Sequence, residues 1–121
     1  MNRPTIKELD NKIREAKAAI RNQNILLVNQ DAIAEDALEL EYDIAEELYE
    51  VLEELLNEIC SDNYVGSRPP EKSYEDKIRN SDLFPFVIDS QRFQCEVYLK
   101  FTLGKNIFWL VSLHKNRPFK E

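Results

Sequence analysis

The feature that most constrains this fold is a change in the spacing of apolar residues near residue 83. Before that point apolar side chains recur every three or four residues, as on one face of an α-helix. After it they alternate with polar side chains, as along a half-buried β-strand. Since helices and strands with one apolar face must bury those faces together, the pattern predicts an α+β fold. We expect N-terminal helices packed on one face of a small antiparallel sheet of at least three strands.

The first helix has a clear start. Thr5 and Glu8 form a capping box, in which each side chain accepts a hydrogen bond from a backbone N–H that the helix leaves unpaired. The polar segment 22–24 ends this helix after about four turns. Residues 25–28 are apolar, and they could be an extended connector or the start of the next element. The apolar stripe of the first helix consists of Ile6, Leu9, Ile13, Ala16 and Ile20.

Two further helices are predicted before residue 61. Asn29 or Asp31 would cap a short helix that runs to about Leu40. A stronger helix extends from about residue 42 to 60, with apolar residues on one face and glutamates on the other. Its apolar face consists of Ile44, Leu48, Val51, Leu52, Leu55 and Ile59.

The second half of the chain predicts three strands. The first begins near Leu83, where Pro85 indicates an edge position or a strand start. Apolar and polar residues then alternate without a break over 93–103, which predicts a long strand. A turn at 104–106 leads into the last strand, 107–114, so the final two strands form a hairpin.

The length of this turn decides the register of the hairpin. A shift of one residue exchanges the two faces of a strand. A two-residue turn would set Trp109 on the face of Tyr98 and Lys100, whereas a three-residue turn groups the apolar residues, so we favour the longer turn. It pairs Leu103 with Ile107, Phe101 with Trp109, Leu99 with Val111 and Val97 with Leu113 on one face, and Tyr98 with Ser112, Glu96 with His114 and Lys100 with Leu110 on the other.

Length and composition predict one domain spanning residues 1–121, of which 43% are apolar and 32% charged. Its parts are a helical region (1–60), a loop with at most a short helix (61–82) and the sheet (83–121). The longest apolar run has about four residues, against the roughly 18 that a membrane helix needs, and the N-terminus lacks an apolar signal segment. We therefore expect a cytoplasmic protein that does not enter a membrane.

Several kinds of binding site are not indicated by the sequence. The two cysteines, Cys60 and Cys95, have no neighbouring Cys or His at the spacing of a zinc site, and they do not form a disulfide framework. Two glycines are too few for a nucleotide-binding glycine-rich loop. We therefore expect no metal ion and no small-molecule cofactor.

The net charge of −7 is distributed unevenly. Residues 1–60 contain six Lys and Arg against 15 Asp and Glu, whereas residues 61–121 contain ten against eight. An acidic protein is a poor non-specific binder of nucleic acid, although a local basic surface can still bind phosphate. In the third predicted helix, Glu47, Glu50 and Glu54 form either a solvated face, which is the ordinary case, or a docking surface for a basic partner.

The polar face of the last hairpin gathers the groups that RNA cleavage without a metal requires. Histidine exchanges protons near neutral pH, lysine and arginine stabilise charge on phosphate, and tyrosine can orient a hydroxyl or act as a base if its pKa is strongly lowered. Glu96 opposite the histidine would favour its charged acid form. Each residue also has an ordinary structural role on a half-exposed strand. The candidates are Tyr98, Lys100, Ser112, His114, Lys115 and Arg117.

The hairpin also resembles a known family. E-V-Y-L-K-F at 96–101 and L-V-S-L-H-K at 110–115 are similar to the terminal hairpin of MqsR-type toxins. These are small RelE-like messenger-RNA interferases of bacterial toxin–antitoxin pairs, ending in V-Y-L-K-I and I-V-S-F-K strands. S-D-N-Y at 61–64 is similar to the family's S-D-F-Y, and I-L-L-V-N at 25–29 to its A-L-L-N segment. The resemblance covers roughly residues 25–115.

The resemblance implies roles for individual residues. Tyr98 matches the strand tyrosine implicated in cleavage, and His114 stands where the family has a catalytic lysine, with Lys115 one position further. Val65 replaces the family's lysine after the S-D-F-Y tyrosine. Arg68 or Lys72 would supply that cation from the loop.

Further departures from the family concern a glutamine before the first strand of the sheet, for which Lys77 and Gln91 are candidates, and the overall charge, since such toxins are usually basic. The expected function is a RelE/MqsR-like endoribonuclease in which Tyr98, His114 and Lys100 act on messenger RNA. Its expected partners are a cognate antitoxin and RNA, which would be bound by Lys115, Arg117, Arg68, Lys72 and Lys77. The alternative is a non-catalytic interaction module, an antitoxin or adaptor, that binds a basic partner through its acidic helix.

Overall fold

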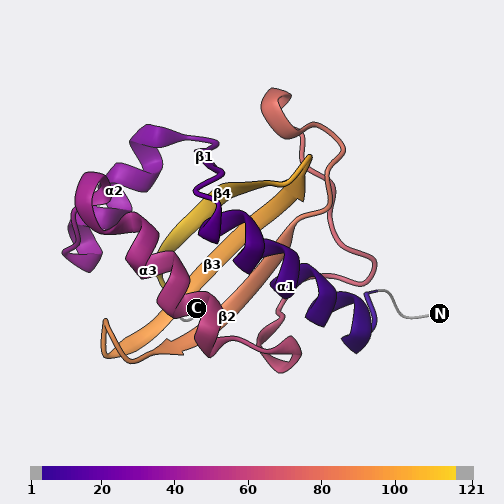
Figure 1. Cartoon of the computed structure of the whole chain (residues 1–121), viewed down its shortest axis with the longest axis horizontal. Coiled ribbons are helices and arrows are strands. Elements are labelled where there is room, and N and C mark those ends of the chain that lie inside the picture. The colour runs from indigo at the N-terminus through magenta and orange to yellow at the C-terminus, as the bar shows by residue number, and fades with distance from the viewer. Residues whose placement is uncertain (1–3, 117–121) are drawn as a thin grey trace, which may run out of the picture.

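The computed structural model describes residues 4–116, which form three helices packed against a four-stranded sheet (Figure 1). The strand order is β1-β4-β3-β2, with β2, β3 and β4 antiparallel and β1 parallel to β4. The α+β fold is thus confirmed. Of residues 25–28, the first three form a short strand at the edge of the sheet, and Val28 follows it. The elements are α1 (Ile6–Arg21), β1 (Ile25–Leu27), α2 (Gln30–Leu40), α3 (Ile44–Glu58), the 3-10 turns η1 (Ser61–Asn63) and η2 (Asp76–Ile78), β2 (Phe84–Ser90), β3 (Cys95–Gly104) and β4 (Ile107–Lys115).

All three helices begin at side-chain caps. The Thr5 hydroxyl accepts the N–H of Glu8 at 3.1 Å, and the Glu8 carboxylate accepts the N–H of Thr5 at 3.0 Å, which confirms the predicted capping box. At the start of α2 the Asn29 side chain accepts the N–H of Ala32 at 3.1 Å, and at the start of α3 the Asp43 carboxylate accepts the N–H of Ala45 at 2.9 Å. No helix within residues 4–116 combines the length and the apolar character needed to cross a lipid bilayer.

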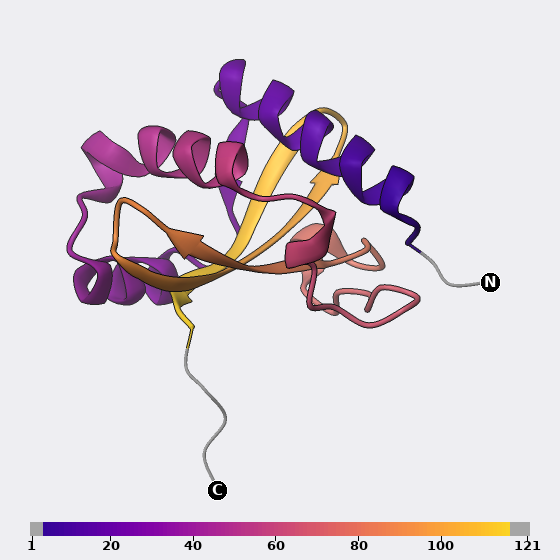
Figure 2. The same cartoon turned by 90° about the horizontal axis from the view of Figure 1, so that it is seen from below.

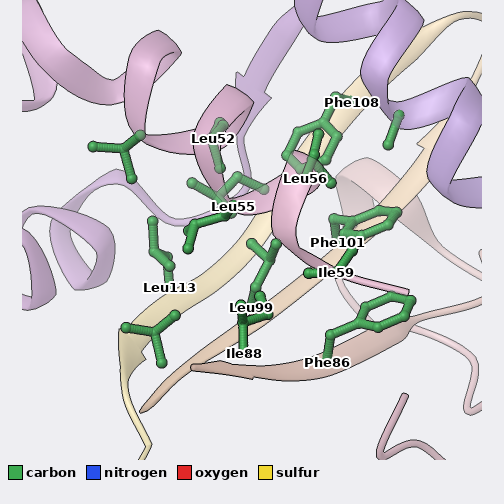
Figure 3. Close-up of a cluster of buried hydrophobic side chains, with 14 of the residues drawn as sticks. Leu52, Leu55, Leu56, Ile59, Phe86, Ile88, Leu99, Phe101, Phe108 and Leu113 are labelled. Atoms are coloured by element: carbon green, nitrogen blue, oxygen red, sulfur yellow. The ribbon is translucent and has the colours of Figure 1, made fainter. Parts of the chain in front are cut away.

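The core lies between the sheet and two of the helices. Helices α1 and α3 cover the same face of the sheet (Figure 2), whereas α2 packs against β4 at the side of the sheet (Figure 1). At the centre, the Phe101 ring stacks on Phe108 with centroids 4.9 Å apart and on Phe86 with centroids 5.7 Å apart. Figure 3 shows side chains from α3 and its end packed among side chains of the three antiparallel strands: Leu52, Leu55, Leu56 and Ile59 among Phe86, Ile88, Leu99, Phe101, Phe108 and Leu113.

The register predicted for the last hairpin is wrong. The turn has two residues, Lys105 and Asn106, with φ values of 53° and 64°, and Gly104 pairs with Ile107. Two successive residues at positive φ suit the right-handed twist of a hairpin. The expected pairs were Leu103 with Ile107, Phe101 with Trp109, Leu99 with Val111, Val97 with Leu113, Tyr98 with Ser112, Glu96 with His114 and Lys100 with Leu110. The observed pairs are Leu103 with Phe108, Phe101 with Leu110, Leu99 with Leu113, Val97 with Lys115, Tyr98 with His114 and Lys100 with Ser112, and Glu96 bonds to Asn116.

An irregularity in the pairing explains how the apolar faces still meet. Phe101 pairs with Leu110, but Lys100 pairs with Ser112, so Val111 is an extra residue on β4. Such a β-bulge shifts the register by one residue and restores the alternation beyond it. The core side chains of both strands therefore share one face on either side of Val111, and Leu99 lies opposite Leu113.

The joint between α2 and α3 buries a hydroxyl without a partner. Tyr42 is 7% exposed, its ring lies 5.9 Å from that of Phe93, and its hydroxyl forms no hydrogen bond. Burial, and to a smaller extent the carboxylate of Asp36, raises the pKa of Tyr42 to about 12.

We expect Tyr42→Phe to stabilise the protein. Removing an unsatisfied buried hydroxyl should raise the free energy of unfolding at pH 7 by about 1–2 kcal/mol. In the wild type, Tyr42 ionises near its ordinary pKa in the unfolded chain but stays neutral in the folded protein. The free energy of unfolding is therefore unaffected by this ionisation below that pKa, and it falls as the pH rises towards 12. Urea denaturation at pH 7 and at pH 10–11 measures both effects. Tyr49→Phe, at a 37% exposed position, is the control, and an equal alkaline loss in Tyr42→Phe would contradict the assignment.

Candidate functional site

The candidate site lies on the face of the sheet that α1 and α3 leave uncovered (Figure 2). Val97, Leu99 and Phe101 are fully buried on the helical side of β3. The residues between them, Tyr98 and Lys100, are half-buried on the opposite side, because side chains alternate along a strand. The hairpin therefore separates a core face from a polar face, as the alternation of the sequence predicts.

Tyr98, His114 and Lys100 lie together on this polar face. Tyr98 is directly opposite His114, and their rings stack with centroids 5.1 Å apart and an interplanar angle of 18°. The ammonium nitrogen of Lys100 is 6.0 Å from the centroid of the Tyr98 ring, and Ser112 lies across from Lys100. An imidazole, a phenol, an ammonium group and a hydroxyl thus share a small area. We refer to Tyr98, Lys100, Ser112 and His114 as the polar cluster.

One ring nitrogen of His114 has a fixed role. Its Nδ1 lies 2.7 Å from the carbonyl oxygen of Lys115. Because a carbonyl oxygen can only accept, Nδ1 carries the proton and donates it. Nε2 is therefore the nitrogen that can gain or lose a proton towards a ligand.

The expected partner of His114 is different from the observed one. Glu96 does not lie across from the histidine: its carboxylate accepts the side-chain N–H of Asn116 at 3.2 Å, and its carbonyl accepts the backbone N–H of Asn116 at 2.9 Å. The shorter turn and the bulge at Val111 bring Tyr98 opposite the imidazole instead. A stacked phenol thus holds the ring where we expected a carboxylate.

Tyr98 is kept in its neutral form. Burial raises the pKa of Tyr98 above its ordinary value, and the carboxylate of Glu71 adds to the rise. A tyrosine acts as a general base near neutral pH only when its pKa is strongly lowered. The structure therefore disfavours Tyr98 as a base, and it leaves the phenol able to donate a hydrogen bond or to stack on a base.

The loop before β2 folds back beside the polar cluster. Residues 71–75 and Leu83 border an open hollow of about 590 Å³, whose other wall is Lys100 and Val111. In this loop Tyr74 is 88% exposed. The hollow gives the cluster a neighbouring space in which an unstacked nucleotide could be bound.

Asp82 anchors this loop to the sheet. Its carboxylate forms an ion pair with Lys72, and its carbonyl oxygen accepts the hydroxyl of Thr102 at 2.6 Å. Thr102 is 1% exposed although it stands on the polar side of β3. Sequence reasoning did not identify Thr102 or Asp82, and the only signal was a β-branched hydroxyl residue between the polar cluster and the turn.

The predicted RNA-binding cations are dispersed. The Arg68 guanidinium donates a hydrogen bond to the Pro4 carbonyl and lies 5.3 Å from the Tyr64 ring centroid, while Lys77 is exposed in η2. Lys72 is paired with Asp82 at the hollow. Lys115 is exposed next to His114. Arg117 lies outside the described residues.

The predicted partner-binding glutamates meet a cation of the same chain. Arg92, in the connection between β2 and β3, places its guanidinium 2.6 Å from Glu47, 3.3 Å from Glu50 and 3.1 Å from Glu54. Its side chain is 23% exposed, whereas those of the glutamates are 38–60% exposed. These contacts join α3 to the sheet and partly neutralise the acidic face. The sequence did not show that Arg92 would reach this helix.

We expect Arg92→Ala to destabilise the protein modestly. It leaves three neighbouring carboxylates without their cation, but all three are partly solvated, so the free energy of unfolding should fall by about 1 kcal/mol. The loss should shrink in high salt, which screens the repulsion. Urea denaturation at low and high salt measures this. The control is Arg79→Ala, which removes the exposed ion pair with Asp76; equal losses in both variants would contradict the expected role of Arg92.

The comparisons with known proteins found no matching family model, no similar curated protein and no similar solved structure. Within residues 4–116, no three His, Cys, Asp or Glu residues are grouped so that they could hold a metal ion.

Proposed function

We propose that this chain is an RNA-cleaving toxin or a relative of such toxins, similar to MqsR-type messenger-RNA interferases. The observation that supports the proposal is the stack of His114 on Tyr98 with Lys100 beside it, on an open face of the sheet. The resemblance of residues 25–115 to that family also supports it, because the segments that carry the resemblance contain all three residues. Messenger RNA and a cognate antitoxin are the proposed partners.

The proposed reaction uses the 2′-hydroxyl of RNA as the nucleophile. Its oxygen forms a bond to phosphorus while the bond from phosphorus to the 5′-oxygen breaks, and the products are a 2′,3′-cyclic phosphate and a 5′-hydroxyl. Protonated Nε2 of His114 gives its proton to the leaving 5′-oxygen, and the 2′-hydroxyl proton passes to water. The Tyr98 phenol orients the reacting ribose, and the ammonium group of Lys100 stabilises the charge that develops on phosphate.

Purified chain, single-stranded RNA and EDTA provide the test, with free RNA and a translating extract as separate substrates. We expect fragments that end in a 2′,3′-cyclic phosphate, and no cleavage of the same sequence with 2′-deoxyribose throughout. Binding of the uncleaved analogue should weaken as salt increases, since Lys100 and Lys115 would displace counterions from phosphate. Intact RNA under both conditions, or equal cleavage of the deoxy analogue, would refute the proposal.

The alternative, an antitoxin or adaptor that receives a basic partner on Glu47, Glu50 and Glu54, has less support. These carboxylates already surround Arg92. A partner bound there would have to compete with an internal ion pair. Glu35 of α2 and Glu41, by contrast, form no ion pair with another residue in the range 4–116, and they lead to a separate inference.

A further inference from the structure

An apolar groove lies between the second half of α2 and the start of α3. Its volume is about 620 Å³, and its apolar wall includes Ala34, Leu38, Tyr42 and Ile44. Leu38 is 79% exposed, more than any other large aliphatic side chain within residues 4–116. Exposing a leucine side chain to water is unfavourable relative to burying it. The groove therefore offers a partner a favourable apolar contact.

The rim of this groove is acidic. Glu35, Glu41 and Asp43 border it. Neither Glu35 nor Glu41 forms an ion pair with another residue in the range 4–116. The surrounding sequence adds to this negative charge, because residues 22–67 contain 13 Asp and Glu and no Lys or Arg. The potential at the groove is thus negative, without a nearby cation of α2 or α3 to offset it.

We propose that this groove docks a basic amphipathic helix of a partner protein. A large apolar side chain of that helix would lie against Leu38 and Ile44, and its lysines or arginines would reach Glu35 and Glu41. An apolar groove that receives the apolar face of a helix is a recurrent mode of peptide recognition, and the acidic rim selects a positively charged partner. RNA and anionic membranes would be repelled by the same charges.

The groove is separate from the proposed cleavage site. It is formed by α2 and α3, whereas the polar cluster lies on β3 and β4 (Figure 1). A second copy docking groove to groove would bring two acidic rims together, which like charges oppose. The inference therefore holds or fails independently of RNA cleavage, and it favours a different protein as the occupant.

The probe for the test is a 14-residue helical peptide of leucine and lysine, titrated into the isotopically labelled full chain and followed by amide chemical shifts. We expect the shift changes to concentrate in residues 34–44. Leu38→Ala should weaken binding about 10-fold or more, because it removes most of the exposed apolar side chain. Its control is Tyr74→Ala, which removes an 88% exposed side chain elsewhere and should change binding less than about twofold.

The contribution of charge needs its own matched pair. The double variant Glu35→Gln with Glu41→Gln should weaken binding by about fivefold and reduce its salt dependence. Glu53→Gln with Glu58→Gln removes the same charge from α3 outside the groove, and it should have little effect. Each variant is judged to be folded if its amide spectrum outside the substituted sites matches that of the wild type.

Three results would overturn the proposal. Equal weakening by both double variants, or no effect of Leu38→Ala, would show general attraction to an acidic surface rather than docking in the groove. A concentration-dependent dimer without peptide that Leu38→Ala abolishes would identify a second copy as the occupant. Localised shift changes with selective loss in Leu38→Ala and in the groove pair would support a basic partner helix.

Discussion

Replacing His114 by alanine is expected to lower the rate of RNA cleavage by about 10²–10⁴-fold, the usual contribution of a positioned general acid. Nδ1 is held by the Lys115 carbonyl at 2.7 Å, so the loss would report on the proton at Nε2. His114→Gln should be nearly as inactive, because an amide does not exchange a proton near neutral pH. Single-turnover cleavage of a short RNA measures the chemical step, and the free energy of unfolding of each variant shows whether it is folded.

Tyr98→Phe separates the two roles that tyrosine could have. The variant keeps the stack on His114 but lacks the hydroxyl, so a phenol that only orients the ribose should cost about 10-fold in rate, close to one hydrogen bond. Because the pKa of Tyr98 is raised, the wild type and this variant should have pH profiles of the same shape below pH 9. If the cleavage rate of the wild type rises with pH through the ionisation of a base, and this rise is absent in Tyr98→Phe, Tyr98 would instead be the base.

The matched control for both substitutions is Tyr49→Phe, a half-exposed tyrosine on α3 away from the polar cluster. Its cleavage rate and pH profile should equal those of the wild type. If His114→Ala and Tyr98→Phe cleave as fast as Tyr49→Phe, the polar cluster is not the active site. Any ribonuclease activity would then have to come from other residues, such as those bordering the hollow at 71–75.

Most of the fold could be predicted because its signals are local. The capping box at Thr5 and the cap at the start of α2 depend only on residues within one turn. The change from a helical to an alternating spacing near residue 83 separates helices from strands for the same reason. The parallel pairing of β1 with β4 could not be predicted, since it joins residues 25–27 to residues 108–110 through no local signal.

The sequence predicted which residues share the polar face, but it did not predict which of them lie opposite one another. The alternation placed Tyr98 and Lys100 on one face, and that face is open. The cross-strand partner of each residue depends on the length of the turn and on the bulge at Val111. Neither residue of the two-residue turn, Lys105 or Asn106, is a glycine, which is the usual sequence signal for such a turn. Contacts over long sequence distances, such as those of Arg92 with α3, were also not visible in the sequence.

Phe101→Ala is expected to be the most destabilising single substitution in the core. Its ring is fully buried and stacks on Phe86 and Phe108 (Figure 3). It is also tilted against Phe84, with centroids 6.1 Å apart. Truncating a buried phenylalanine removes apolar contacts and leaves a cavity, so the free energy of unfolding should fall by about 3–5 kcal/mol. Domains of this size are stable by about 5–15 kcal/mol, so a large part of the folded population could be lost. Urea denaturation followed by far-ultraviolet circular dichroism measures the change.

The conservative variant shows whether this cost comes from the cavity or from the backbone. Phe101 adjoins the register shift, which lies between Lys100 and Phe101, so its ring also holds β3 against β4 next to the bulge that aligns the polar cluster. Phe101→Leu keeps much of the volume, and it should cost about 1–2 kcal/mol, while Tyr74→Ala, at an 88% exposed position, should stay within about 0.5 kcal/mol of the wild type. A loss in Phe101→Ala no larger than that in Tyr74→Ala would contradict the packing of Phe101 at the centre of the core. If Phe101→Leu stays folded but changes the amide shifts of Tyr98 and His114, the core residue also maintains the alignment of the polar cluster across the bulge.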